Sequence, residues 1–399
     1  MVLEPVDPNA RFRERRYRAR RRRKLQLSAF LGALVLSAIG GGLIVWFTGD
    51  RAGRAAETVK TSAIQQESAP RISVPKEIRG IHVTMGLAGV PGKLDEYLRL
   101  TEEGLNTIEL DIKDENGAVA FASQNAPLVN EIGADGGFYD PKQVADRIHA
   151  SDVYLIGRVV TFEDPVLSER KPDLAILRTD GSPWLTSAGL GWTNEYDKRV
   201  WEYNVSIAKA AALAGFDEIQ FDYVRFPSDG DVSNAVWPRR RNEPQAVTIA
   251  RFMKYAASQL KPLGVRVSID VFGLAATRDL GIGQSPKRLA PLVDAISPMV
   301  YPSHFGNGEY GLPDPQAVPG TTVGYALSDF SGQMAGKRAE LVPWIQDFSM
   351  GRHYTLSDIQ DQILAVRRAR ARGYLLWNPS GIYTRGALQP ANGAVVFSD

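Results

Sequence analysis

Charged side chains follow a short apolar run near the middle of this chain, in the segment 217–227, which reads DEIQFDYVRFP. Apolar Ile219 and Phe221 alternate with polar residues, a period of two that indicates a β-strand with one polar face. A carboxylate, Asp222, ends this strand and a guanidinium, Arg225, follows it, which suits acid–base chemistry or binding of a polar ligand. The alternative is a structural ion pair between the two that fixes the following loop.

The elements around this segment must place it inside an α/β protein. Amphipathic helical patterns at 196–214 and 245–263 flank it, so the strand is expected to be buried on both sides. We predict eight strands, near residues 80–84, 107–113, 154–161, 218–225, 266–271, 295–301, 340–346 and 374–377.

Helical patterns separate most of these strands, at residues 93–103, 141–150, 195–214, 245–263, 286–293, 322–334 and 357–372. Glycines at 104, 215, 264 and 373 stand where a left-handed residue would end a helix. Eight strands with intervening helices favour a (β/α)8 barrel, the TIM-barrel fold, over a doubly wound sheet.

Four aspartates stand at the carboxyl ends of predicted strands: Asp111, Asp222, Asp270 and Asp347. A barrel brings these ends together at one mouth. Hydrolysis of a glycosidic bond needs two such groups, one ionised as nucleophile or base and one protonated as acid. Asp111 has a structural alternative, because Lys113 could pair with it.

Five segments together resemble the putative glycosyl hydrolase domain family, over roughly residues 77 to 390. The resemblance implies a TIM barrel distantly related to the alpha-amylase-like glycosidases and a hydrolase acting on O-glycosyl bonds. The segments, in chain order, are ELDIKDENG at 109–117, DEIQFDYVRFP at 217–227, SIDVFG at 268–273, ISPMVYPSHF at 296–305 and PWIQDF at 343–348.

The resemblance also implies roles for the carboxylates. It places Asp222 at the nucleophile position of amylase-like barrels, with Arg225 keeping a neighbouring carboxylate ionised. Asp270, on the next strand, would be the general acid/base, although amylase-like barrels carry a glutamate there. Asp347 would be a third catalytic carboxylate that assists Asp270 or exchanges roles with it.

Aromatic and polar side chains near the same predicted face suggest a carbohydrate cleft, because flat rings cover sugar faces and amides bind hydroxyls. Packing in the core is the alternative for any single aromatic residue. The candidates for substrate binding are Asp111, Tyr223, Arg225, Tyr301, His304, Trp344, Gln346, Trp377 and Asn378; Trp184, Trp192 and Tyr383 lie near the same loops, and His82 is a further hydroxyl-binding candidate.

The amino-terminal region carries a different signal. Nine arginines and one lysine between 11 and 24 precede a 23-residue stretch without charge, 25–47. This length favours an uncleaved transmembrane signal-anchor, with the basic end in the cytoplasm. Cleavage after Ala38 is one alternative, and binding of nucleic acid or acidic lipid by the basic run is another. The expected domains are a basic cytoplasmic tail (1–24), the anchor (25–47), a flexible linker (48–76) and the barrel (77–399).

Composition limits the remaining function classes. The net charge of +2 divides into +7 for residues 1–24 and −5 for the rest, so the barrel shows no basic excess for nucleic acid. The sequence has no cysteine, hence no disulfide, thiol nucleophile or cysteine-bound metal. The four histidines have no HxH or HExxH spacing, and we expect neither a metal nor a cofactor.

The combined expectation is a membrane-anchored barrel in the cell envelope that hydrolyses a polysaccharide or envelope glycan through a carboxylate pair. A non-catalytic glycan-binding barrel is the first alternative, because binding needs only the aromatic platform. A structural envelope protein, with loops that block the mouth, is the second.

Overall fold

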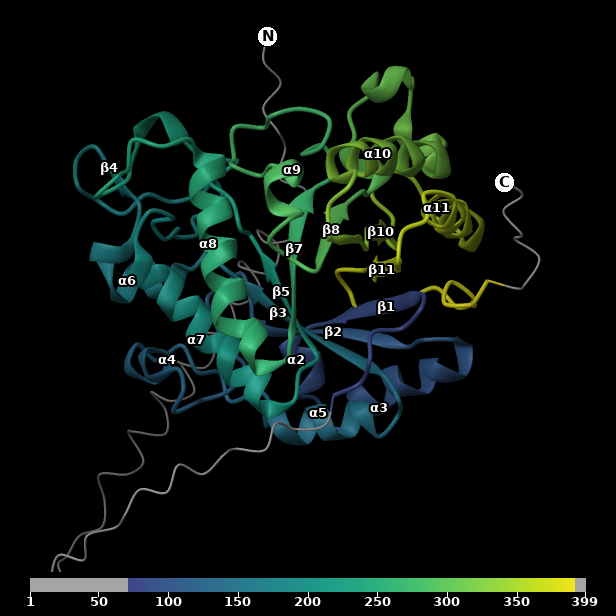
Figure 1. The fold of residues 1–399 in the computed structure, drawn as a ribbon, viewed down its shortest axis with the longest axis horizontal. Helices are drawn as coiled ribbons and strands as arrows, with labels where there is room; N and C mark the ends of the chain where they lie inside the picture. Colours follow the sequence, from purple (N-terminus) through teal and green to yellow (C-terminus); the bar gives the residue numbers. More distant parts are fainter. Residues whose placement is uncertain (1–70, 392–399) are drawn as a thin grey trace, which may run out of the picture. The chain divides into compact units, whose positions relative to one another are not determined.

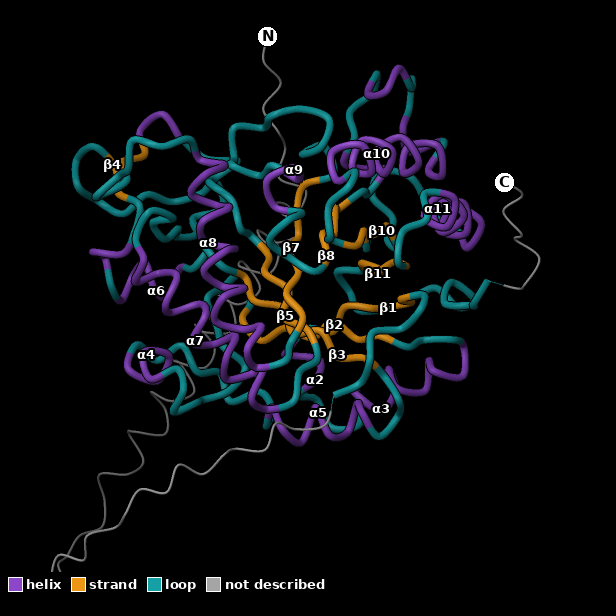
Figure 2. Tube along the Cα trace, in the orientation of Figure 1, coloured by secondary structure: helices purple, strands orange, loops and turns teal. Residues whose placement is uncertain are grey.

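The computed structural model describes residues 71–391, and its centre is a closed barrel of parallel strands (Figures 1 and 2). β11 pairs with β1, and β10 pairs with both β8 and β11, so the sheet closes on itself. The eight-stranded α/β barrel predicted from the sequence is confirmed. Its strands, in order around the barrel, are β1 (Ile78–Val83), β2 (Thr107–Lys113), β3 (Tyr154–Val160), β5 (Glu218–Asp222), β7 (Arg266–Phe272), β8 (Ala295–Met299), β10 (Trp344–Gln346) and β11 (Gly373–Trp377).

Three short strands supplement the barrel. β9 (Glu340–Leu341) pairs with β8 just before β10, and Pro343, which has no backbone N–H, stands between β9 and β10. β4 (Leu177–Arg178) and β6 (Ala235–Val236) pair antiparallel, which joins the loop after β3 to the loop after β5.

Helices cover the outside of the barrel (Figure 1). Asp197 accepts a hydrogen bond from the N–H of Arg199 to begin the longest helix, and Gly215, with φ of 115°, ends it. Gly373 is not a helix cap as expected: it opens β11 beside Ile78, and Arg370, with φ of 55°, follows the last helix instead. The helices are α2 (Met85–Ala88), α3 (Lys93–Leu98), α4 (Pro127–Glu131), α5 (Pro141–His149), α6 (Pro165–Arg170), α7 (Lys198–Ala214), α8 (Gln245–Leu260), α9 (Pro286–Leu289), α10 (Pro319–Met334) and α11 (Leu356–Arg368).

Alternation along the strands divides the molecule into an outer core and a barrel interior. Ile219 and Phe221 point outward and belong to the large apolar cluster beneath the helices. Gln220 and Asp222 occupy the alternate positions of the same strand, which face the interior. A smaller apolar cluster fills part of the interior and includes Ile78, Tyr154, Ile156, Ala295, Val342 and Leu375.

Residues 71–76, expected to be part of the flexible linker, lie against the barrel. The guanidinium of Arg71 donates to the carbonyl oxygens of Ala212 and Phe216 at 2.7 and 3.2 Å. Ile72 packs against the interior cluster, and its N–H donates to Asp217 at 2.9 Å. Residues 71–76 therefore belong with the barrel, although its predicted boundary is at 77.

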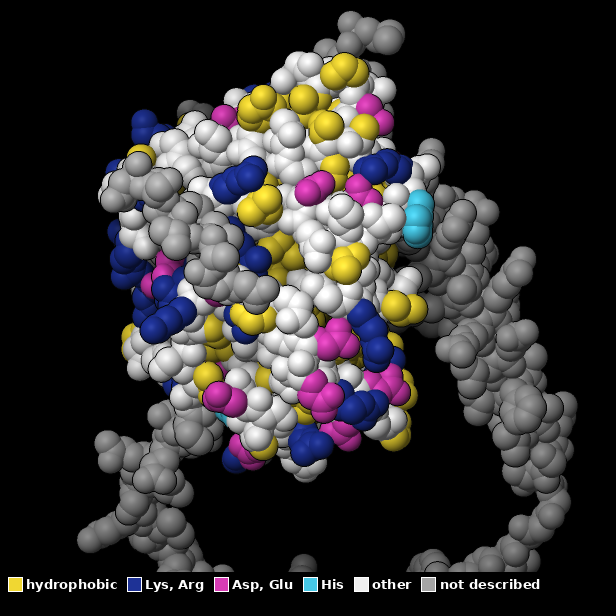
Figure 3. All heavy atoms as spheres, turned by 90° about the vertical axis from the view of Figure 1, so that its right-hand side faces the viewer, with side chains coloured by type: hydrophobic (Ala, Val, Ile, Leu, Met, Phe, Trp, Pro, Cys, Tyr) yellow, Lys and Arg dark blue, Asp and Glu magenta, His cyan; other side chains and the backbone are white. Residues whose placement is uncertain are grey.

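Basic and acidic side chains are interspersed on the face of the molecule that Figure 3 presents. Within residues 71–391, no helix is both long and apolar enough to cross a membrane. The predicted tail, the anchor at 25–47 and most of the linker lie outside the described residues, so the anchor remains a prediction.

Asp217 helps to hold the segment 71–76 against the barrel, and a substitution at this residue tests that role. This buried carboxylate accepts bonds from the N–H groups of Ile72 and Leu155 and contacts His149 at 2.9 Å. Replacing Asp217 with Ala should lower the free energy of unfolding by about 2–4 kcal/mol, because buried N–H groups lose their partner. Urea denaturation measures the change. Asp146→Ala, which removes a surface pair with Lys142, should cost less than about 1 kcal/mol; equal losses would contradict this role for Asp217.

Candidate active site

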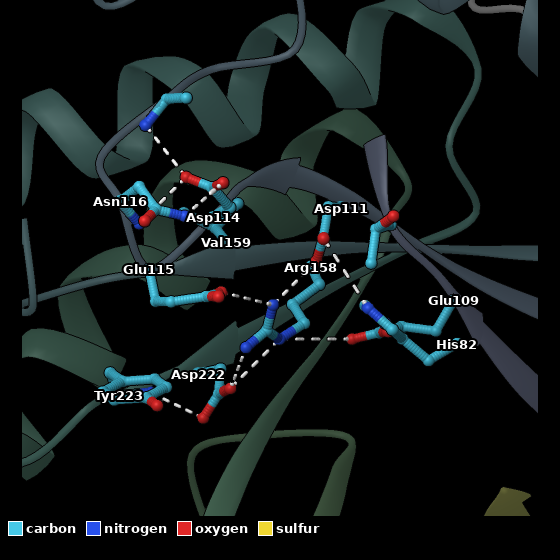
Figure 4. A network of polar contacts seen from close by, with 12 residues as sticks. His82, Glu109, Asp111, Asp114, Glu115, Asn116, Arg158, Val159, Asp222 and Tyr223 are labelled. Carbon is cyan, nitrogen blue, oxygen red and sulfur yellow. Dashed lines mark hydrogen bonds and ion pairs between the residues drawn. The ribbon is translucent and has the colours of Figure 1, made fainter. Parts of the chain in front are cut away.

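Arg158, on β3, is the buried cation around which the acidic side chains of the barrel gather (Figure 4). Its Nε and Nη2 atoms donate to Oδ2 of Asp222 at 3.0 and 2.6 Å, and Nη1 donates to Oδ1 of Asp111 at 2.7 Å. Nε also lies 3.8 Å from Oε1 of Glu109, and Nη1 lies 4.0 Å from Oε2 of Glu115. Burial alone would lower the pKa of Arg158, but the surrounding carboxylates raise it well above its ordinary value. One guanidinium thus joins carboxylates from β2 and β5.

His82 on β1 and Glu109 on β2 form a second buried pair beside this guanidinium. Nδ1 of His82 is hydrogen-bonded to Oε2 of Glu109, and Nε2 lies 3.6 Å from Oδ2 of Asp111. Burial raises the pKa of Glu109. Burial would lower the pKa of His82, but Asp111 and Glu109 together outweigh it, so the pKa of His82 is raised. Glu109, His82, Asp111, Arg158 and Asp222 therefore form one continuous row.

Asp111 does not pair with Lys113, the partner that the structural alternative gave it. Its partner is Arg158, whereas Lys113 lies on the other side of an irregularity in β2 and binds Asp164 at 2.8 Å. Lys113 also donates to Oδ1 of Asn204 at 3.1 Å. Asp111 therefore belongs to the polar row, and Lys113 does not.

Asp270, on β7, is a carboxyl group in an environment that favours its protonated form. Its Oδ1 accepts hydrogen bonds from Nε2 of Gln220 at 2.7 Å and Nε1 of Trp344 at 2.8 Å. Only 2 % of the residue is exposed. Burial, followed by the charges of Asp222 and Glu109, raises the pKa of Asp270 well above its ordinary value.

Asp222 and Asp270 are brought together by strand register. Phe221 pairs with Ile269, so the two aspartates follow at the same level of neighbouring strands and on the same face. Oδ1 of Asp222 accepts a bond from the N–H of Tyr223 at 2.6 Å. Tyr223 has φ of 52°, a left-handed conformation that is strained for a bulky residue and recurs at functional sites. Both oxygens of Asp222 are therefore held in place.

Arg225 lies among aromatic rings. Its guanidinium carbon is 4.9 Å from the ring centres of Trp192 and Tyr223 and 4.8 Å from that of Phe272. Burial raises the pKa of Glu195 to about 8, and the charge of Arg225 opposes part of that rise. Asp222 is bound by the guanidinium of Arg158, whereas the structural alternative paired it with Arg225.

Trp184 and Trp192, expected near the binding face, are buried in the cores of the loops. The indole of Trp184 donates to the carbonyl of Asp231 at 2.8 Å. Oε1 of Glu195 accepts from the indole of Trp192 at 2.8 Å, and Oε2 accepts from that of Trp237 at 2.7 Å. These contacts tie the loop after β3 to the loop after β5.

Asp347, after β10, supports the chain that follows β11. Its Oδ1 accepts from the hydroxyl of Thr384 at 2.6 Å, and Oδ2 accepts from the N–H of the same residue at 2.8 Å. Burial raises the pKa of Asp347 to about 6, and the bonds from Thr384 oppose the rise. Asn378 also contacts Asp347, through a bond from Nδ2 to its carbonyl oxygen.

Among the other predicted binding residues, some contribute aromatic rings to the site and others hold the loops around it. Trp377 is only partly buried and lies 4.5 Å from the ring of His82 and 5.7 Å from the guanidinium of Arg158, which puts it at the polar row. Tyr301 packs 5.1 Å from the ring of His304, and burial lowers the pKa of His304 to about 3, so that imidazole is neutral. These rings are the aromatic part of the site.

Gln346, expected to bind a sugar hydroxyl, is fully buried and holds backbone instead. Its Oε1 accepts from the N–H of Ser303 at 3.0 Å, and its Nε2 donates to the carbonyl of Phe348 at 2.8 Å. With Asn378, it stabilises the loops that surround the mouth.

Arg158 was missed by the reasoning from sequence, and Glu109 was noted only as part of a motif. Both stand on barrel strands, YLIGRVV and TIELDIK, at positions that alternate with outward-facing residues. A charged residue at an inward position of a barrel strand is the signal that would have found them. A hollow of about 950 Å³ lies elsewhere, between α10 and α11. Its lining includes Arg352, Asp358, Asp361 and Arg368 but none of the carboxylates of the barrel mouth, so the two places are distinct.

Arg158 should dominate the stability of the site. Arg158→Met leaves Asp111 and Asp222 buried without their cation, which should lower the free energy of unfolding by about 3–5 kcal/mol. Urea denaturation measures this loss. The triple variant with Asp111→Asn and Asp222→Asn should regain part of it, because the uncompensated charges are gone; a triple variant no more stable than Arg158→Met would contradict the ion-pair account.

Asp270 should make stability depend on pH. Its folded-state pKa lies above the unfolded value of about 3.9, so the folded protein binds more protons above that pH and loses stability as pH rises. Asp270→Asn cannot ionise, and its stability relative to wild type should increase as the pH rises above about 4. Urea denaturation over a series of pH values tests the prediction, with Asp361→Asn, at an exposed position of α11, as control. A difference independent of pH would refute the raised pKa.

Comparison with protein-family models matches residues 80–383 to the family described as putative glycosyl hydrolase domain. A hypothetical protein from Ruminiclostridium thermocellum is 38 % identical; the match covers 48 % of this chain and 97 % of that one, with a TM-score of 0.44. A search of curated proteins finds no match.

Two further solved structures share the fold at low identity. The glycoside hydrolase domain of PgaB (BpsB) from Bordetella bronchiseptica is 13 % identical, with a TM-score of 0.55 over 76 % of this chain and 95 % of that one. A chitobiase from Flavobacterium johnsoniae is 10 % identical, with a TM-score of 0.50 over 78 % of this chain and 47 % of that one. With most of its barrel matched by the family model, the chain belongs to the putative glycosyl hydrolase domain family.

Proposed function

We propose that this protein hydrolyses O-glycosidic bonds of a polysaccharide or cell-envelope glycan, with Asp222 and Asp270 as the catalytic pair. The observation that carries the proposal is the contrast between them: Asp222 is ion-paired with Arg158, whereas burial and neighbouring charge favour the protonated form of Asp270. Glycoside hydrolysis needs this division between an ionised and a protonated carboxyl group.

In this mechanism, Asp222 acts as nucleophile or base and Asp270 as the acid that protonates the leaving oxygen. Asp222 is at the carboxyl end of β5, and its fixed oxygens limit the reorganisation that reaction requires. Oδ1 of Asp270 already accepts two N–H bonds, which leaves Oδ2 to carry the proton. The two carboxyl groups are on neighbouring strands, where backbones are roughly 5 Å apart.

Substrate would be held by the groups around this pair. Trp377 is the candidate platform for a sugar ring, because it borders the polar row and keeps part of its surface open. Asp111, Tyr301 and His304 are the candidate hydroxyl-binding groups. Asp347, bound through both oxygens to Thr384, is better suited to holding the loop than to acid–base exchange with Asp270.

The proposed location is the cell envelope, with residues 25–47 in the membrane and the amino terminus in the cytoplasm. Its support is the uncharged 23-residue stretch behind a basic run. Protease accessibility of the barrel and the tail in intact cells and in lysed cells tests this topology.

Release of reducing ends from a panel of envelope and exopolysaccharide glycans tests the activity, with the full-length chain. Asp222→Asn and Asp270→Asn should each lower the rate at least about a hundredfold, since positioned acid–base groups contribute about 10²–10⁴. Asp361→Asn, an exposed change on α11, should leave the rate unchanged. Circular dichroism confirms that the variants are folded.

Two results would overturn the proposal. Cleavage that survives both substitutions would assign catalysis to other groups. Binding of a glycan by wild type and by both variants, without cleavage by any of them, would favour the non-catalytic glycan-binding barrel.

A further inference from the structure

Three buried polar atoms inside the barrel have no hydrogen-bond partner among the described residues: Oε1 of Glu109, Oε1 of Gln220 and Oγ of Ser268. All three residues are completely shielded from solvent. An unpaired buried polar group costs about 1–3 kcal/mol, and such groups in proteins usually bind another group or an ordered water. These atoms are also separate from the bonds that hold Asp222 to Arg158.

Strand register and a shared neighbour, Arg158, connect the three residues. Gln220 on β5 pairs in register with Arg158 on one side and with Ser268 on the other. Oε1 of Glu109 lies 3.8 Å from Nε of the same Arg158. Ser268 precedes Asp270 by two residues on the same face of β7, so Ser268 lies directly beneath the proposed acid.

The chemistry of these atoms restricts what they can bind. The carboxylate oxygen of Glu109 and the amide oxygen of Gln220 only accept hydrogen bonds, whereas the hydroxyl of Ser268 can also donate one. The guanidinium of Arg158, 3.8 Å from Oε1 of Glu109, repels a cation. A ligand for all three atoms must therefore be small and must donate at least two hydrogen bonds. Water meets both conditions, and neither an anion nor an apolar molecule does.

We propose that Glu109, Gln220 and Ser268 form a binding site for one buried water molecule, which fixes the orientation of the Gln220 amide beneath Asp270. The water donates to Glu109 and Gln220 and accepts from the hydroxyl of Ser268. With Oε1 of Gln220 turned to the water, its Nε2 faces Oδ1 of Asp270, as the structure has it.

This arrangement makes Gln220 and Ser268 positioning residues for the proposed acid. An amide turned the other way would present an oxygen to Oδ1 of Asp270, and the proton would be drawn to that atom. The titratable groups facing Asp270 are Glu109 from β2, Arg158 from β3, Asp222 from β5 and Tyr301 after β8. The water site stands on the unpaired atoms alone, whereas its role in catalysis rests on the proposed function.

Crystal structures of the wild type, of Ser268→Ala and of Ser168→Ala test the site directly. Ser168 is the matched control, because its buried hydroxyl on α6 donates to the carbonyl of Pro165 outside the barrel. We expect an ordered water bonded to all three atoms in the wild type and the control, and its loss or displacement in Ser268→Ala. A wild-type structure in which the three atoms bond to one another, or in which no water reaches them, would overturn the proposal.

A carbon-13 NMR titration of the Asp270 carboxyl, without substrate, tests the link to the acid. In Ser268→Ala the pKa of Asp270 should rise further, because the N–H of Gln220 donates a weaker bond once its oxygen no longer accepts from water. Ser168→Ala should leave the titration unchanged. An unchanged titration in Ser268→Ala would refute the positioning role. Neither measurement uses a glycan, so an inactive protein would count against the proposed function alone.

Discussion

A single buried guanidinium is the constraint on which the arrangement of this barrel mouth depends. Arg158 can remain inside the barrel only because carboxylates surround it, and without Arg158 those groups would be buried with no cation beside them. Yet Glu109, Asp111, Asp222 and Asp270 outnumber Arg158 and His82 in the same interior. The excess of acid groups favours a carboxyl that keeps its proton, and burial makes Asp270 that group.

The fold shields this charge cluster from solvent. Apolar side chains fill the interior around Ile78 and Tyr154, and outward residues of the barrel strands belong to the large apolar cluster, so the polar row occupies a shielded site. The segment from Arg71 adds contacts to the start of β5 through Asp217. Stability is thus concentrated in the apolar layers, which leaves the inward positions near the carboxyl ends of the strands available for chemistry.

A second set of polar contacts holds the loops in place without touching the acid pair. Glu195 accepts two indole N–H groups, Asp347 binds Thr384, and the amide of Gln346 binds the backbone on two sides. Several residues that looked suited to sugar recognition serve this purpose. In a barrel whose binding surface is built from loops, such contacts are as necessary as the groups that face the ligand.

The sequence by itself determined the eight strands, most of the helices, the fold class, and the position of Asp111, Asp222 and Asp270 at strand ends. These features follow from local patterns, the alternation of apolar residues in strands and the amphipathic period of helices. Only the tertiary structure decided which charged side chains pair with one another. Arg158 lies 47 residues from Asp111 and 64 from Asp222, whereas Arg225, three residues from Asp222, packs among aromatic rings. Ion pairs inside a barrel join neighbouring strands, and strands that are neighbours in space are separated in the chain by whole helices and loops.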